Sequence, residues 1–145
     1  MKEKVKISYI ENSLQYEDYC NLRQRVGWNN WSKEQTIRAL KNSLYDIVAV
    51  DDGVIGMGRL LGDGLYYIIV DIVVAPEYQG KSIGSELIKR ILDYADSQTP
   101  SGSRASIQLI AEKGKEEFYE KLGFKKIPHE HCGSGMRKII HKEAH

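Results

Sequence analysis

The stretch Gln79-Gly80-Lys81-Ser82-Ile83-Gly84-Ser85 lies between an apolar run, residues 66–75, and an amphipathic segment, residues 86–96. This order predicts a strand, a tight turn and a helix. The first turn of a helix has backbone N–H groups without intrahelical partners, and the helix dipole adds partial positive charge there. The two glycines let an anion approach the backbone, and the lysine adds a full charge. The stretch is therefore predicted to bind a phosphate or pyrophosphate group.

The size and composition of the chain are those of an ordinary globular protein. It has 145 residues, of which 41% are hydrophobic and 28% are charged, so we expect residues 1–145 to form a single domain. A net charge of +1 argues against nucleic-acid binding. No apolar run approaches the ~20 residues of a membrane helix. Two distant cysteines and no signal-peptide pattern lead us to expect a cytoplasmic protein.

Strand and helix patterns alternate before the turn. We expect a strand at 5–9, helices at 14–26 and 32–44, and a hairpin of strands at 46–50 and 54–61. Ser32 and Gln35 have the spacing of a helix-capping box. Gly56 and Gly58 interrupt the second hairpin strand, which indicates a bulge or a close neighbour.

The run from Leu65 to Ala75 is nearly all apolar and predicts a central strand buried on both faces. Asp71 is the exception, and burying its charge costs roughly several kcal/mol unless it is partnered. After the turn and its helix we expect a parallel strand at 105–111, a short helix at 115–122, and closing strands at 124–127 and 136–140. The predicted fold is α/β with a mixed sheet, in the order strand-helix-helix-strand-strand-strand-helix-strand-helix-strand-strand.

The turn also matches a second pattern. Ala75 to Ser82 fits the loose Walker A motif of P-loop nucleotide-binding enzymes. The residues between Ala75 and Gly80 are bulky, whereas a loop that wraps a phosphate favours small ones. No later apolar strand ends in a clear Mg²⁺-binding aspartate. A P-loop enzyme is therefore the less favoured alternative.

Two segments together resemble one enzyme family. The stretch from Pro76 to Gly84 is similar to the acetyl-CoA-binding signature of the GNAT N-acetyltransferase superfamily, Arg/Gln-x-x-Gly-x-Gly/Ala, with Ser82 in place of the middle glycine. Residues 118–124, Phe-Tyr-Glu-Lys-Leu-Gly-Phe, are very like the family's late Phe-Tyr-x-Lys-x-Gly-Phe segment. The order of elements also matches. The resemblance implies the GNAT acyl-CoA N-acyltransferase fold over nearly the whole chain.

The resemblance implies a reaction as well: an amine attacks the acetyl thioester of acetyl-CoA directly, in a ternary complex and without a metal. The implied cofactor-binding residues are those of the turn and the end of the long strand: Ile72, Val73, Val74, Gln79, Gly80, Lys81, Ser82, Gly84 and Ser85. Backbone donors aimed at a developing oxyanion contribute ~3 kcal/mol. Tyr119 matches the family's tyrosine near the cofactor sulfur, so it is the implied general acid and a further cofactor contact.

The attacking amine must lose a proton, because its pKa lies near ~10. Asp71 is the carboxylate nearest the expected acetyl position, and some GNAT members have an acid there. We therefore predict a catalytic role for Asp71, which favours a cationic acceptor. The alternative is a carboxylate held by the backbone or by Arg59. Small amines, amino acids, antibiotics and protein amines all remain open as acceptors.

Other residues allow two interpretations each. Trp28 and Trp31 either wall the acceptor site or pack, and Lys115 and Lys121 either meet the cofactor's 3′-phosphate or lie in solvent. The stretch 129–132, His-Glu-His-Cys, looks like a metal cluster, but adjacent ligands on a short loop rarely converge on one ion, so we expect no metal. A homodimer, and a non-catalytic acyl-CoA-binding module, also remain open.

Overall fold

The computed structural model describes residues 6–144, which form two compact units, residues 6–110 and residues 111–144. The predicted first strand begins at Val5, outside the described residues, and the described strand β1 is Ser8–Glu11.

The first unit contains one mixed sheet, as predicted. Its elements are β1 (Ser8–Glu11), α1 (Tyr16–Arg25), α2 (Lys33–Lys41), β2 (Tyr45–Val50), β3 (Val54–Gly62), β4 (Tyr66–Val74), the 3₁₀ turn η1 (Pro76–Tyr78), α3 (Ile83–Gln98) and β5 (Ser106–Gln108). The strand order is β1-β2-β3-β4-β5. The first four strands pair antiparallel, and β4 pairs with β5 in parallel. The α/β fold class and the parallel β4–β5 pair are confirmed.

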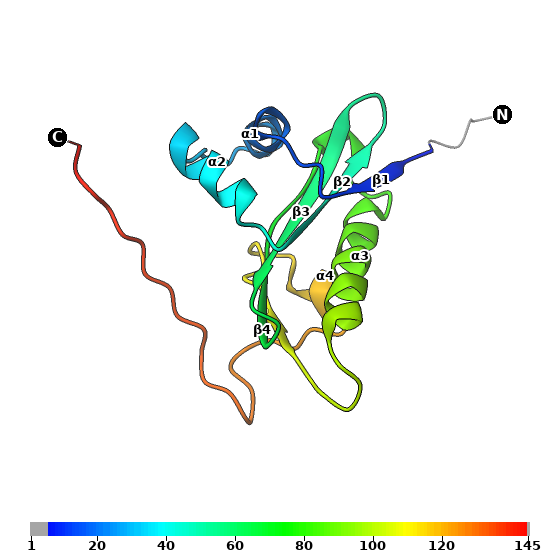
Figure 1. Ribbon diagram of the computed structural model, residues 1–145, viewed down its shortest axis with the longest axis vertical. Coiled ribbons are helices and arrows are strands. Elements are labelled where there is room, and N and C mark those ends of the chain that lie inside the picture. The colour runs from blue at the N-terminus through cyan, green and yellow to red at the C-terminus, as the bar shows by residue number, and fades with distance from the viewer. Residues whose placement is uncertain (1–5, 145) are drawn as a thin grey trace. The chain divides into compact units, whose positions relative to one another are not determined.

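Helices cover both faces of this sheet (Figure 1). Helix α3 packs against β2, β3 and β4 on one face, and α1 packs against β3 and β4 on the other. Helix α3 buries a stripe that repeats at helical spacing: Ile83, Leu87, Ile88, Ile91 and Ala95. The strand β4 thus has α3 on one face and α1 on the other, whereas its first residues, Tyr66 and Ile68, and the turn at 79–82 are exposed, so the predicted burial of the strand on both faces holds only in part.

Local signals in the sequence explain how these elements begin and pack. The backbone N–H of Gln35 donates to Ser32 Oγ (3.2 Å), which confirms the capping box of α2. Gly56 and Gly58 face α3 at close range: a Cβ on Gly58 would lie 2.6 Å from Ile72 Cδ1 and 2.9 Å from Ile91 Cδ1. The close-neighbour interpretation of these two glycines is confirmed.

The second unit has less regular structure than the sequence predicts. It contains α4 (Glu116–Glu120) and an isolated bridge between His129 and Cys132. The closing strands predicted at 124–127 and 136–140 are not formed. Met136 is 95% exposed and Ile140 86% exposed, so within residues 6–144 this segment has neither a neighbouring strand nor an apolar surface to cover. A strand needs both, and the apolar pattern alone was not sufficient.

Among the helices of residues 6–144, none has the length and apolar character required to cross a bilayer.

Candidate functional site

The turn between β4 and α3 presents a row of free backbone donors. None of the N–H groups of residues 80–85 donates a hydrogen bond to another described residue. The first helical bond at this end runs from Glu86 N–H to the Ser82 carbonyl (3.2 Å). Gly80 and Ser82 both have left-handed φ angles, 78° and 63°, which let the chain turn sharply into the helix. Such a row at a helix N-terminus is an anion-binding site.

Three contacts fix this turn to the rest of the first unit. The Tyr78 hydroxyl donates to Asp51 Oδ2 (2.6 Å) in the β2–β3 hairpin, and Arg25, at the end of α1, pairs with Glu77. Gln79 Nε2 donates to the Val74 carbonyl (3.0 Å). The Gln79 side chain therefore closes the turn, and the Lys81 ammonium remains beside the Tyr78 ring, 5.4 Å from its centroid.

The strand β4 parts from β5 before it reaches the turn. The two strands pair only at residues 66–68 of β4, although β4 continues to Val74. Ile72, Val73 and Val74 therefore lie where β4 has lost its β5 neighbour. A role for these three residues in cofactor binding stays a prediction.

A bulge interrupts β4 at Asp71. Met57 pairs with Val73 and Arg59 pairs with Val70, so two residues along β3 span three along β4. Asp71 itself has a left-handed φ of 56°, which an aspartate adopts at a cost of about 1 kcal/mol or more. This conformation is maintained only where surrounding contacts determine it, and the Asp71 side chain supplies them.

The Asp71 carboxylate is held by three donors. Its Oδ1 accepts from Arg23 Nη1 (2.6 Å), and its Oδ2 accepts from Arg59 Nη1 (2.7 Å) and from the Tyr19 hydroxyl (2.9 Å). Burial and the neighbouring carboxylate raise the pKa of Tyr19 to about 12, so its hydroxyl remains a proton donor at neutral pH. This is the partnered arrangement that the sequence left open, with Arg23 and Tyr19 added to Arg59. A catalytic role for Asp71 stays a prediction.

Arg23 is a further residue of this site that was not expected from the sequence. Its signal was present, because Tyr19, Leu22 and Arg23 share the buried face of α1. Arg23 also donates from Nη2 to the Asn29 carbonyl (2.7 Å), and its guanidinium lies 5.2 Å from the Trp28 ring and 5.9 Å from the Trp31 ring. The two tryptophans are thus arranged around Arg23.

A family model described as an acetyltransferase (GNAT) domain matches residues 42–126. The chain belongs to the GNAT acetyltransferase family. A structure from meticillin-resistant Staphylococcus aureus, described as a probable acetyltransferase, is 31% identical with a TM-score of 0.80, and covers 92% of this chain and 100% of its own. A GNAT family protein from Streptococcus pneumoniae is 32% identical with a TM-score of 0.77, over 94% of this chain and 100% of its own.

A curated relative is also described as an N-acetyltransferase. An uncharacterized N-acetyltransferase of Pyropia yezoensis is 30% identical over 123 residues, which cover 81% of this chain and 67% of the relative. The resemblance to GNAT enzymes inferred from the two motifs is therefore confirmed, and cofactor binding by the turn after β4 stays a prediction.

In the second unit, Tyr119 lies on α4 between two aromatic neighbours. Its ring meets Phe118 and Phe124 edge to face, at centroid distances of 4.9 and 6.0 Å. Burial and the Glu112 carboxylate raise the pKa of the Tyr119 hydroxyl, which therefore remains protonated at neutral pH. Lys115 and Lys121 flank α4 and are exposed. The proposed catalytic role of Tyr119 and the possible contacts of Lys115 and Lys121 with the cofactor stay predictions.

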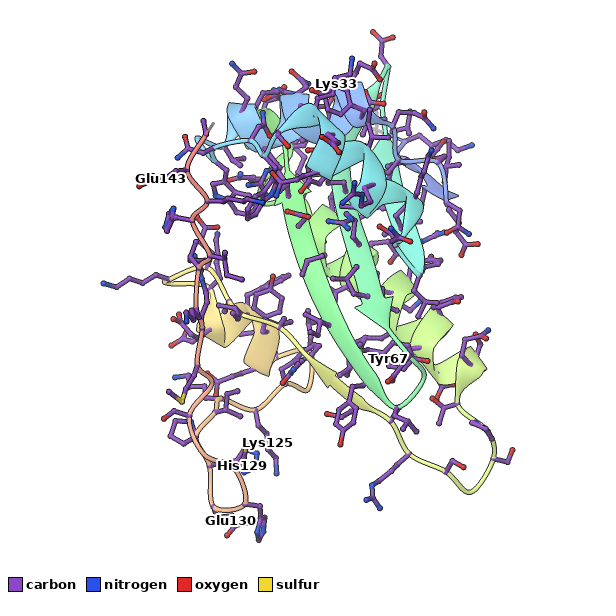
Figure 2. All side chains as sticks on the ribbon, turned by 60° about the vertical axis from the view of Figure 1, so that its left-hand side comes forward. Lys33, Tyr67, Lys125, His129, Glu130 and Glu143 are labelled. Carbon is purple, nitrogen blue, oxygen red and sulfur yellow. The ribbon has the colours of Figure 1, made fainter. Side chains whose placement is uncertain are left out.

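The His129–Cys132 stretch forms a tight turn. His129 N–H donates to the Cys132 carbonyl (3.0 Å), and Cys132 N–H donates back to the His129 carbonyl (3.1 Å). Figure 2 shows the labelled His129 and Glu130 on this one loop. Within residues 6–144, no group of three or more His, Cys, Asp or Glu side chains is placed to hold a metal ion.

Ser82 offers a direct test of the turn geometry. A left-handed φ costs a non-glycine residue roughly 1–2 kcal/mol, and the Ser82 side chain makes no capping bond in return. Ser82→Gly is therefore expected to raise the free energy of unfolding by about 1 kcal/mol, measured by urea denaturation without ligand. Ser85→Gly, in the first turn of α3, should lower it by about 0.5 kcal/mol. A loss of stability in Ser82→Gly would contradict the left-handed turn.

Proposed function

We propose that this GNAT protein transfers an acetyl group from acetyl-CoA to an amine acceptor, by direct attack in a ternary complex. The observation that carries the proposal is the row of unpaired N–H groups at residues 80–85, which follows the part of β4 that has no β5 partner. A pyrophosphate fits the row, because the donors, the α3 dipole and Lys81 all favour negative charge there.

Each chemical step has a candidate group in the chain. β4 has no β5 partner at residues 72–74, which supports a role for backbone N–H groups there in polarising the thioester carbonyl. The protonated Tyr119 hydroxyl suits a general acid for the leaving thiolate. Both Asp71 oxygens already accept strong hydrogen bonds, so we assign the proton of the amine to water rather than to Asp71.

The proposed acceptor is an amine, either of a small molecule or of a protein. The carboxylate of Asp71 is outnumbered by two guanidinium groups, so it no longer favours a cationic acceptor. A cytoplasmic location, a single catalytic domain over residues 1–145 and a homodimer remain part of the proposal.

Acetyl-CoA binding and turnover test the function directly. We expect calorimetry to show acetyl-CoA binding, and a panel of amines to release free thiol with at least one acceptor. Lys81→Ala should weaken binding about fivefold, since it loses one exposed contact to a phosphate worth about 1 kcal/mol. Lys89→Ala, two turns along α3 on an exposed position, is the matched control and should bind normally.

Two outcomes would refute the proposal in different ways. Binding of Mg²⁺-ATP in place of acetyl-CoA would indicate the P-loop alternative. Acetyl-CoA binding without thiol release for any amine would favour a non-catalytic acyl-CoA-binding module.

The general-acid role of Tyr119 has its own prediction. Tyr119→Phe removes the proton donor and keeps the ring contacts with Phe118 and Phe124. A thiolate is a fair leaving group, with a pKa near ~8.5 by analogy with cysteine, so we expect kcat to fall only about tenfold. The acetyl-CoA affinity should change little, because the other proposed cofactor contacts remain. An unaltered kcat, measured by thiol release with the best acceptor, would remove this role.

A further inference from the structure

Three buried ionised side chains meet at the bulge of β4. The side chains of Arg23, Asp71 and Arg59 are 10%, 10% and 7% exposed, and both arginines contact the carboxylate within 2.7 Å. Two guanidinium groups face one carboxylate. Removing one partner from such a group leaves an unpaired buried charge, so the three side chains act as a unit.

The Arg23–Asp71–Arg59 cluster connects four elements of the first unit. Arg59 comes from β3 and reaches the end of α2, where Nε donates to Ser43 Oγ (2.9 Å) and Nη2 donates to the Ala39 carbonyl (3.2 Å). Asp71 is the left-handed residue of the β4 bulge. Arg23 comes from α1. The position of the bulge is therefore fixed by both helices of one face.

Arg23 extends this connection to the loop between α1 and α2. Its Nη1 donates to Asp71 Oδ1 (2.6 Å), and its Nη2 donates to the Asn29 carbonyl (2.7 Å). The same group lies against the rings of Trp28 and Trp31, at 5.2 and 5.9 Å. The forked, planar shape of arginine is needed to make these contacts together.

We propose that the Arg23–Asp71–Arg59 cluster positions the reacting region, and that Arg23 is a positioning residue for acetyl transfer. The cluster holds the bulge immediately before residues 72–74. Through Arg23 it also fixes the α1–α2 loop that carries Trp28 and Trp31, called here the tryptophan loop. Because the role of residues 72–74 is part of the proposed function, this inference rests on it. The turn at residues 79–85 is fixed by other contacts, so we expect loss of the cluster to lower the rate of catalysis much more than the affinity for CoA.

Arg23→Lys separates this role from the others. Lysine keeps the charge beside Asp71 but has no fork to bind Asn29 at the same time. We expect kcat to fall at least tenfold, with the Kd for CoA within twofold of the wild-type value. Because the chain's 2 tryptophans are Trp28 and Trp31, we also expect acrylamide quenching of tryptophan fluorescence to increase about twofold.

Arg38→Lys is the matched control. Arg38 pairs with Glu34 on the exposed face of α2, where the two side chains are 71% and 84% exposed. None of the three readouts should change in this variant. Arg59→Lys repeats the test from β3 if Arg23→Lys does not fold, which circular dichroism will show, and it should lower kcat to a similar extent.

Asp71→Asn distinguishes positioning from base catalysis. If the cluster positions the site, Asp71→Asn and Arg23→Lys both lower kcat and leave the shape of the pH–rate profile unchanged. A loss of the acidic limb in Asp71→Asn, with normal kcat in Arg23→Lys, would instead make Asp71 the base and overturn the proposal.

Two other results would also overturn the positioning role. One is wild-type kcat and wild-type quenching in folded Arg23→Lys. The other is an equal loss of kcat and of CoA affinity, which would indicate general loosening. Failure of the wild-type protein to bind acetyl-CoA would instead refute the proposed function itself, and it is measured first.

Discussion

The free N–H groups at the start of α3 are the feature on which the functional account depends. A helix that began with side-chain caps would have used some of these donors, and Ser82 at the N-cap makes no such bond. The left-handed residues at 80 and 82 turn the chain from η1 into the helix. Side chains from the hairpin and from α1 then fix the turn from outside. The donors are thereby arranged before any anion arrives, which lowers the cost of binding one.

The bulge in β4 shows how a strained residue is maintained. Asp71 adopts a conformation that costs an isolated chain free energy, and its carboxylate is buried among charged partners. Neither feature is stable alone, since the bulge places the carboxylate and the two arginines fix the bulge. This mutual dependence ties the end of β4 to α1, α2 and the tryptophan loop.

Features that depend on nearby residues could be predicted from the sequence. The turn at 79–85, the capping box of α2, the close approach at Gly58 and the parallel β4–β5 pair were all visible as local patterns. The Arg23–Asp71 pair was not, because the partners are 48 positions apart and only the fold brings them together. The closing strands were predicted wrongly for a related reason: a strand exists only with a neighbour, which the pattern of residues 136–140 does not reveal.

The central claim is that the unpaired donors of residues 80–85 bind the pyrophosphate. Titration of the ¹⁵N-labelled protein with CoA, followed by amide chemical shifts, tests it most directly. We expect the amide signals of these residues to move most and to saturate with one common Kd. Saturable CoA binding that leaves these amides unmoved, while others shift, would contradict it.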